Sequence, residues 1–143
     1  MKEEIFDKFQ RFYEIYSKEK DEKLVFLTTA TIEDLLNRAL KKRLLASRLG
    51  LISVGLAEEL QLLRKIRREF KNKIDCTTLD YKEAQIFCVN LKAPAYLKTK
   101  SDHINRRFSN TPRGNFELTV TIISCMLDDI LDNVKTISQT PMY

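Results

Sequence analysis

The segment over residues 115–138 constrains the fold most, because it carries apolar residues on nearly every side. One stripe follows a 3.6-residue repeat and comprises Phe116, Val120, Ile123, Leu127, Ile130 and Val134. The first half is also apolar on its other side, at Leu118, Ile122, Cys125 and Met126, before Asp128, Asp129 and Asp132 restore a polar face. Such a helix has to be buried by other elements. The sequence therefore predicts a central helix, covered by the rest of this chain or in part by a second copy.

Four further segments show apolar spacing typical of helices, over about 2–18, 22–48, 53–74 and 79–92. The first carries an aromatic stripe expected to dock onto the body of the protein or onto another subunit: Ile5, Phe9, Phe12 and Tyr16. The third has its apolar stripe at Leu56, Leu60, Leu63, Ile66, Phe70 and Ile74, and the fourth at Leu79, Ile86 and Val89 with Phe87 and Cys88 flanking them. With only three glycines and three prolines in 143 residues, tight turns are few. The chain is predicted to be a single all-α domain, residues 1–143, with about five helices.

The predicted helix ends depend on a few residues that typically start or end a helix. Gly50 suits the position just past the second helix, and Ser53 suits the N-cap of the third. Pro94 is expected to end the fourth helix. The stretch from Pro94 to Gly114 is rich in lysine and arginine and is predicted to be an irregular loop.

Composition excludes several classes of protein. The first residues are charged and no apolar run approaches 18 residues, so neither a signal peptide nor a membrane span is predicted. Three widely spaced cysteines and one histidine, His103, give no readable zinc site or disulfide framework. We therefore expect a cytoplasmic protein with no metal and no cofactor.

A cluster of four cations gives the clearest candidate for a functional surface. Arg64, Arg67, Arg68 and Lys71 cluster on another side of the third helix from its apolar stripe. Such a run is most often a solvated face, and Arg68 and Lys71 also suit the negative end of the helix. Arg67 lies at the edge of the apolar stripe, where Glu33 or Asp34 is expected to hold it. The functional interpretation is that these four residues bind an anionic partner.

Motifs for catalysis are absent from the sequence. His103 has no cysteine or serine motif beside it, and no glycine-rich phosphate loop or His-Glu-x-x-His run is present. The adjacent Glu33 and Asp34 diverge by about 100° on a helix, and pairing of this acidic pair with Arg38 is the simpler expectation. The chain is therefore predicted not to be an enzyme.

Several short blocks together resemble the mannitol operon repressor family of small all-helical bacterial regulators. The blocks are TIEDLLNRAL at 31–40, GLIS followed by ELQLLRKIRREF within 50–70, and RRFSNTPRGNFELTVTII at 106–123. The resemblance spans roughly residues 24–131. It implies negative regulation of transcription, with mannitol utilisation as the type case.

This sequence departs from the family pattern at two places. The connection near Leu44 to Gly50 is shorter than is usual in the family. The family signature commonly ends in Phe-Ala-His, whereas Phe70 is followed here by Lys71 and Asn72. An Arg-x4-His arrangement like that of the helical HEPN ribonucleases would be Arg67-x4-Asn72, and an asparagine cannot exchange a proton near neutral pH.

The expected function is transcriptional regulation of sugar or sugar-alcohol utilisation, mainly through protein–protein contacts, by a homodimer. A HEPN-like nucleic-acid-binding module derived from a ribonuclease, or a repressor that binds DNA directly, are the alternatives. The nearest approach to a helix-turn-helix places its turn at Arg48 to Ser53, but Glu58 and Glu59 follow where phosphate contacts would begin. Weak, non-specific nucleic-acid binding is compatible with a net charge of +5.

We predict that the protein does not cleave RNA, because Asn72 stands where the ribonuclease pattern has its histidine and the only histidine, His103, is isolated. The measurement is incubation of the purified protein with structured RNA and a divalent metal, followed by gel analysis. Cleavage that is lost on Arg67→Ala would contradict this prediction and favour the ribonuclease alternative.

Overall fold

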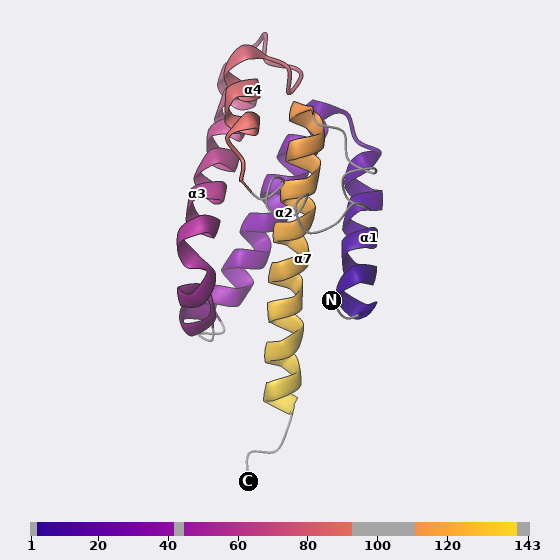
Figure 1. Ribbon diagram of the computed structural model, residues 1–143, viewed down its shortest axis with the longest axis vertical. Coiled ribbons are helices and arrows are strands. Elements are labelled where there is room, and N and C mark those ends of the chain that lie inside the picture. The colour runs from indigo at the N-terminus through magenta and orange to yellow at the C-terminus, as the bar shows by residue number, and fades with distance from the viewer. Residues whose placement is uncertain (1–2, 42–44, 93–110, 140–143) are drawn as a thin grey trace.

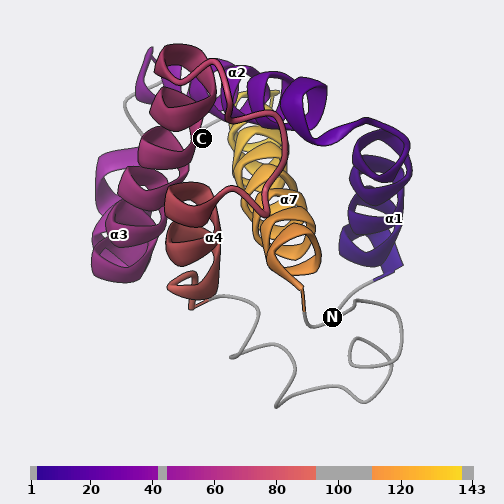
Figure 2. The ribbon, with the colours of Figure 1, turned by 90° about the horizontal axis from the view of Figure 1, so that it is seen from above.

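The computed structural model describes residues 3–41, 45–92 and 111–139 and shows an all-α fold, as predicted. The described residues form five helices: α1 (Glu3–Ser17), α2 (Asp21–Lys41), α3 (Leu45–Asn72), α4 (Lys82–Val89) and α7 (Pro112–Gln139). Seen from above, α7 runs through the middle, with α1 on one side and α3 and α4 on the other (Figure 2). Helix α2 crosses beside α7 and joins the two sides, and α7 packs against α1, α2 and α4.

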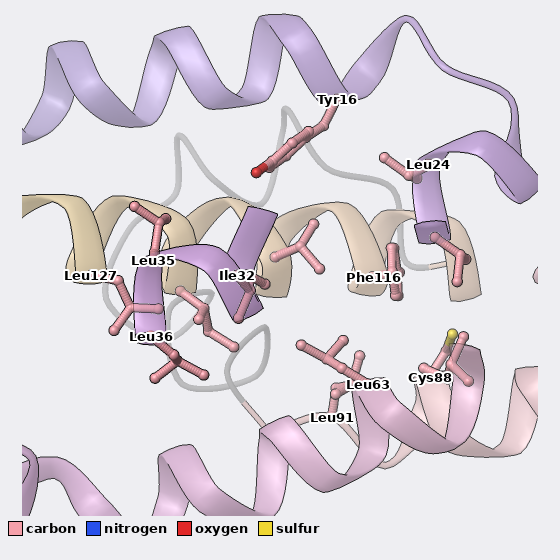
Figure 3. Close-up of a cluster of buried hydrophobic side chains, with 14 of the residues drawn as sticks. Tyr16, Leu24, Ile32, Leu35, Leu36, Leu63, Cys88, Leu91, Phe116 and Leu127 are labelled. Carbon is pink, nitrogen blue, oxygen red and sulfur yellow. The ribbon is translucent and has the colours of Figure 1, made fainter. Parts of the chain in front are cut away.

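The prediction that the last helix is central is confirmed. Its buried apolar side chains lie on both predicted faces and include Phe116, Leu118, Val120, Ile123, Cys125, Leu127, Ile130 and Leu131. All of these except Leu118 and Cys125 join side chains of α1 to α4 in one core (Figure 3). The first half of α7 is thus buried within a single chain, so its apolar character does not require a second copy.

Buried hydroxyl groups in α2 and α7 are satisfied by their own helices. Thr28 and Thr29 donate to the carbonyls of Leu24 and Val25, each at 2.7 Å. Thr121 donates to the carbonyl of Glu117 at 2.6 Å. A threonine hydroxyl that bonds the carbonyl four residues back needs no water, which allows these polar residues to lie in the core.

The predicted boundary between the second and third helices is wrong. Gly50 and Ser53 lie inside α3, which begins at Leu45, so Gly50 does not follow the end of a helix and Ser53 is not an N-cap. A glycine inside a helix costs only about 1 kcal/mol, and the surrounding leucine, alanine and glutamate residues favour the helix. Residues 48–53, the nearest approach to a helix-turn-helix turn, are helical as well, which agrees with the sequence argument against that motif. The remaining connection, residues 42–44, lies outside the described residues.

The predicted faces of α4 and of the segment before it also need correction. The buried face of α4 carries the small residues Ala84 and Cys88, whereas Ile86 and Val89 are 51% and 62% exposed. The helix ends at Val89, before Pro94 could end it. Ile74 is 95% exposed, because α3 ends at Asn72 and the apolar spacing no longer applies beyond that point.

Helix α7 begins three residues earlier than predicted. The Thr111 hydroxyl accepts a hydrogen bond from the Gly114 N–H at 3.0 Å, as an N-cap residue does, and Pro112 occupies the first helical position. The end of the predicted loop therefore belongs to the helix. The rest of that segment, including His103, lies outside the described residues.

The early start of α7 places Arg113 where it joins three parts of the chain. Its guanidinium bonds the Asp21 carboxylate at 2.6 Å, the Glu117 carboxylate at 3.2 Å and the Glu19 carbonyl at 2.5 Å. The other oxygen of Asp21 accepts the backbone N–H of Leu79 at 2.7 Å. Desolvation lowers the pKa of Arg113, but the bonds and charges of the two carboxylates outweigh it and raise the pKa. This network ties the α1–α2 corner, the segment before α4 and the start of α7 together.

Helix α1 is fixed to the later turns of α7 by polar contacts. Lys8, largely buried, lies 2.5 Å from Asp132, 3.4 Å from Asp129 and 3.7 Å from Asp128. The buried Tyr16 hydroxyl lies 2.8 Å from the Ser124 hydroxyl, and its ring points from α1 towards α7 (Figure 3). The aromatic stripe of α1 therefore docks onto the body of its own chain through Tyr16.

We predict that Arg113→Ala lowers the free energy of unfolding by about 3 kcal/mol, because it leaves carboxylates and carbonyls without their partner in a partly buried network. Arg64→Ala is the matched control, since it removes an arginine from an exposed ion pair and should cost less than about 1 kcal/mol. Urea denaturation followed by circular dichroism measures both. Equal losses in the two variants would show that the Arg113 network does not hold the fold.

Candidate functional site

The basic face of the protein lies on the outer side of α3 and consists of Arg64, Arg67, Arg68 and Lys71. All four residues are exposed. The adjoining side of the same helix is buried in the core through Leu56, Leu63, Ile66 and Phe70. Burial of this stripe fixes the rotation of α3 and so directs the four cations outward, as the sequence predicted.

The carboxylates of α2 are paired differently from the prediction for Arg67. Glu33 accepts a hydrogen bond from Arg64 Nε at 3.0 Å, so Arg64, and not Arg67, is held by this residue. Asp34 pairs with Arg38 of its own helix at 2.7 Å, which confirms that part of the expectation. Arg64 lies one turn closer to the start of α3 than Arg67, where α3 meets Glu33 of α2. The side chains of Arg64 and Glu33 are 54% and 39% exposed, so the pair contributes little to stability.

Three cations of the basic face remain for an external partner. Among the described residues, Arg67, Arg68 and Lys71 form no ion pair, whereas Arg64 does. The three lie within five positions, or about 6 Å, along α3. Like charges this close repel one another and favour binding of an anionic group.

A small groove between α2 and α3 borders the basic face. Its walls are mostly apolar and include Thr29, Ile32, Leu60 and Leu63, with Glu33, Arg64 and Arg67 also lining it. The hollow measures about 20 Å³, which is room for roughly one water molecule. A metabolite needs several hundred Å³, so this groove is too small to be a substrate pocket.

On its other side, the basic face borders α4. The ammonium group of Lys65 lies 5.8 Å from the centre of the Phe87 ring. This distance is within the range of a cation–π contact. Lys65 is therefore turned towards α4, which separates it from the cations that face outward.

The cysteines have the properties of core residues. All three are free and buried. Burial raises the pKa of Cys76 and Cys125 to about 11 and that of Cys88 to about 12. Thiols with such pKa values are protonated near neutral pH and are poor nucleophiles and metal ligands. In the part of the chain that the structure describes, no group of three His, Cys, Asp or Glu residues is arranged to hold a metal ion.

Two polar clusters were not predicted from the sequence. The sequence pattern places Asp128, Asp129 and Asp132 on a polar face, and in the structure they form ion pairs with Lys8 of α1. Arg113 was assigned to a loop. A signal for its helical position was present, since Thr-Pro at 111–112 is a typical N-cap followed by the first helical residue.

Among the described residues, no helix combines the length and the apolarity that crossing a bilayer requires. Comparisons of the chain with protein-family models, with curated proteins and with solved structures find no match. The resemblance to the mannitol operon repressor family therefore stays a prediction that depends on the sequence blocks quoted above.

We predict that any binding to DNA is weak, independent of sequence and sensitive to salt. Three unpaired cations that contact phosphates give a slope of about −2.7 for the logarithm of the binding constant against the logarithm of the salt concentration. Affinity therefore falls roughly 40-fold between about 50 and about 200 mM salt. Fluorescence anisotropy with two unrelated DNA duplexes measures the slope. Nanomolar and sequence-selective binding at physiological salt would instead favour a repressor that contacts an operator directly.

Proposed function

We propose that this protein is a repressor-like transcriptional regulator of sugar or sugar-alcohol utilisation that acts in the cytoplasm, mainly through protein–protein contacts. The observation that carries the proposal is the exposed basic face of α3, with three cations that no described carboxylate neutralises. The regulatory role itself comes from the family resemblance. The basic face is its proposed point of contact.

A protein partner suits this surface better than a DNA operator. Helix α3 runs without a break from Leu45 to Asn72, so residues 48–53 do not form the turn that would precede a recognition helix. The apolar groove beside Arg67 has no counterpart in phosphate binding. Arginine next to apolar surface is, by contrast, typical of the energetic centre of protein–protein interfaces.

The homodimer is also a proposal. Burial of the first half of α7 within one chain removes one of the two arguments for it. The other was the aromatic stripe of α1, of which Tyr16 is buried in the same chain. Ile15, 53% exposed on α1, is apolar surface that a second copy could cover. Light scattering at micromolar concentration distinguishes dimer from monomer.

The experiment that tests the function is complementation in a strain from which the gene has been deleted. We expect deletion to raise transcripts of sugar or sugar-alcohol utilisation genes, and the wild-type gene to restore repression. The triple variant Arg67→Ala, Arg68→Ala, Lys71→Ala should not restore it, although its thermal unfolding should match that of the wild type because these side chains make no internal ion pair among the described residues.

The matched control removes three exposed cations elsewhere, by Lys18→Ala, Lys20→Ala and Lys82→Ala. It changes the net charge by the same amount, and we expect it to repress like the wild type. Repression by the basic-face variant would exclude this surface from the mechanism. Unchanged sugar-utilisation transcripts after deletion would contradict the proposed function itself.

A further inference from the structure

The groove between α2 and α3 combines an apolar wall with arginine side chains at its edge. Leu60, partly buried, lies in its wall beside Ile32 and Leu63, which are each 2% exposed. At about 20 Å³ the hollow accepts little more than the tip of an aliphatic side chain. Arg64 and Arg67 also line it, so an apolar contact and a charged contact are available side by side.

The structure already places a carboxylate against this groove. Glu33 lies 3.0 Å from Arg64 Nε. Because water reaches both Glu33 and Arg64, their contact is weak enough for another carboxylate to replace Glu33. Arg67, which lines the same groove, has no ion pair among the described residues. Arg64 is thus partly neutralised from within the chain, and Arg67 is not.

We propose that the groove and the basic face together bind an acidic amphipathic helix of a partner protein. One apolar side chain of that helix packs against Leu60, and its carboxylates pair with Arg67, Arg68 and Lys71. Glu33 competes with the partner for Arg64 and lowers the affinity. This inference rests on the proposed function, and it names the chemistry of the partner at the same surface.

A helix fits the dimensions of this surface. Leu60 and Lys71 are eleven positions apart on α3, or about 16 Å, which corresponds to about three turns of a partner helix lying alongside. A helix of that length presents apolar residues on one side and acidic residues on the flanks, which is the usual arrangement for a helix bound in a groove. A nucleic acid would satisfy the cations, but its phosphates would leave the apolar wall without a contact.

The test uses two labelled synthetic peptides of about 15 residues and identical composition. One places leucine at helical spacing with glutamate on the flanks, and the other scrambles the order so that the leucines share no face. Fluorescence anisotropy with the full chain should show the amphipathic peptide binding at least about 10-fold more tightly than the scrambled one, since only the first can fill the groove and pair with the cations together.

Two matched pairs of variants locate the site. Leu60→Ala should weaken binding of the amphipathic peptide about 10-fold, whereas Leu62→Ala, also partly buried on α3 but outside the groove, should not. Glu33→Gln should tighten binding about 3-fold by releasing Arg64. Asp34→Asn adds the same net charge but releases Arg38 instead, and should have a smaller effect.

Several results would overturn the inference. These are equal binding of the two peptides, no binding of the amphipathic peptide at millimolar concentration, equal effects of Glu33→Gln and Asp34→Asn, or tighter binding of a single-stranded RNA of the same charge. Each of them leaves the complementation experiment unaffected. If the basic-face variant still fails to repress while the peptide does not bind, the regulatory function stands and the class of partner is wrong.

Discussion

The contact between Arg113 and Asp21 is the interaction on which the arrangement of the helices depends most. Through one side chain, the first turn of α7 reaches the α1–α2 corner, and through Asp21 the same network reaches the backbone of Leu79 before α4. These segments are far apart in sequence and meet at one end of the bundle (Figure 1). The core then continues along α7, where apolar side chains of α1, α2, α3 and α4 converge.

The charged residues of this chain fall into two groups with different roles. Lys8 and Arg113 are largely withdrawn from water and contact carboxylates of other elements, so they position helices. Arg67, Arg68 and Lys71 point outward from a helix whose other side is locked in the core. The second group can bind and release a partner without unfolding the protein, because the first group and the core stabilise the fold.

Helix periodicity predicted most of the fold and the location of the basic face. The repeat from Phe116 to Ile130 identified the central helix, and the stripe from Leu56 to Phe70 identified which side of α3 is exposed. The prediction failed where a single residue was taken to mark the end of a helix, since Gly50 lies within α3. It also failed in part on α4, where Ile86 and Val89 face outward and the small Ala84 faces the core beside Cys88.

Pairing between elements could not be predicted in the same way. Arg64 and Arg67 lie on α3, which packs against the helix of Glu33, but the choice of Arg64 as the partner of Glu33 depends on how α2 and α3 are aligned. The same holds for Lys8 and its aspartates, which are more than 100 positions apart. Apolar spacing fixes the rotation of a helix about its axis, whereas the axial position is set only by packing in three dimensions.

The separation of internal from external arginines is tested most directly by nuclear magnetic resonance of the arginine side chains in the isolated protein. The account predicts that the Nε–H proton of Arg113 exchanges slowly with water and keeps its chemical shift as salt is raised, because carboxylates and carbonyls surround the guanidinium. Arg67 and Arg68 should exchange rapidly and respond to salt. Exchange of Arg113 as fast as that of Arg67, or a salt-independent and protected Arg67, would contradict the assignment of the basic face to an external partner.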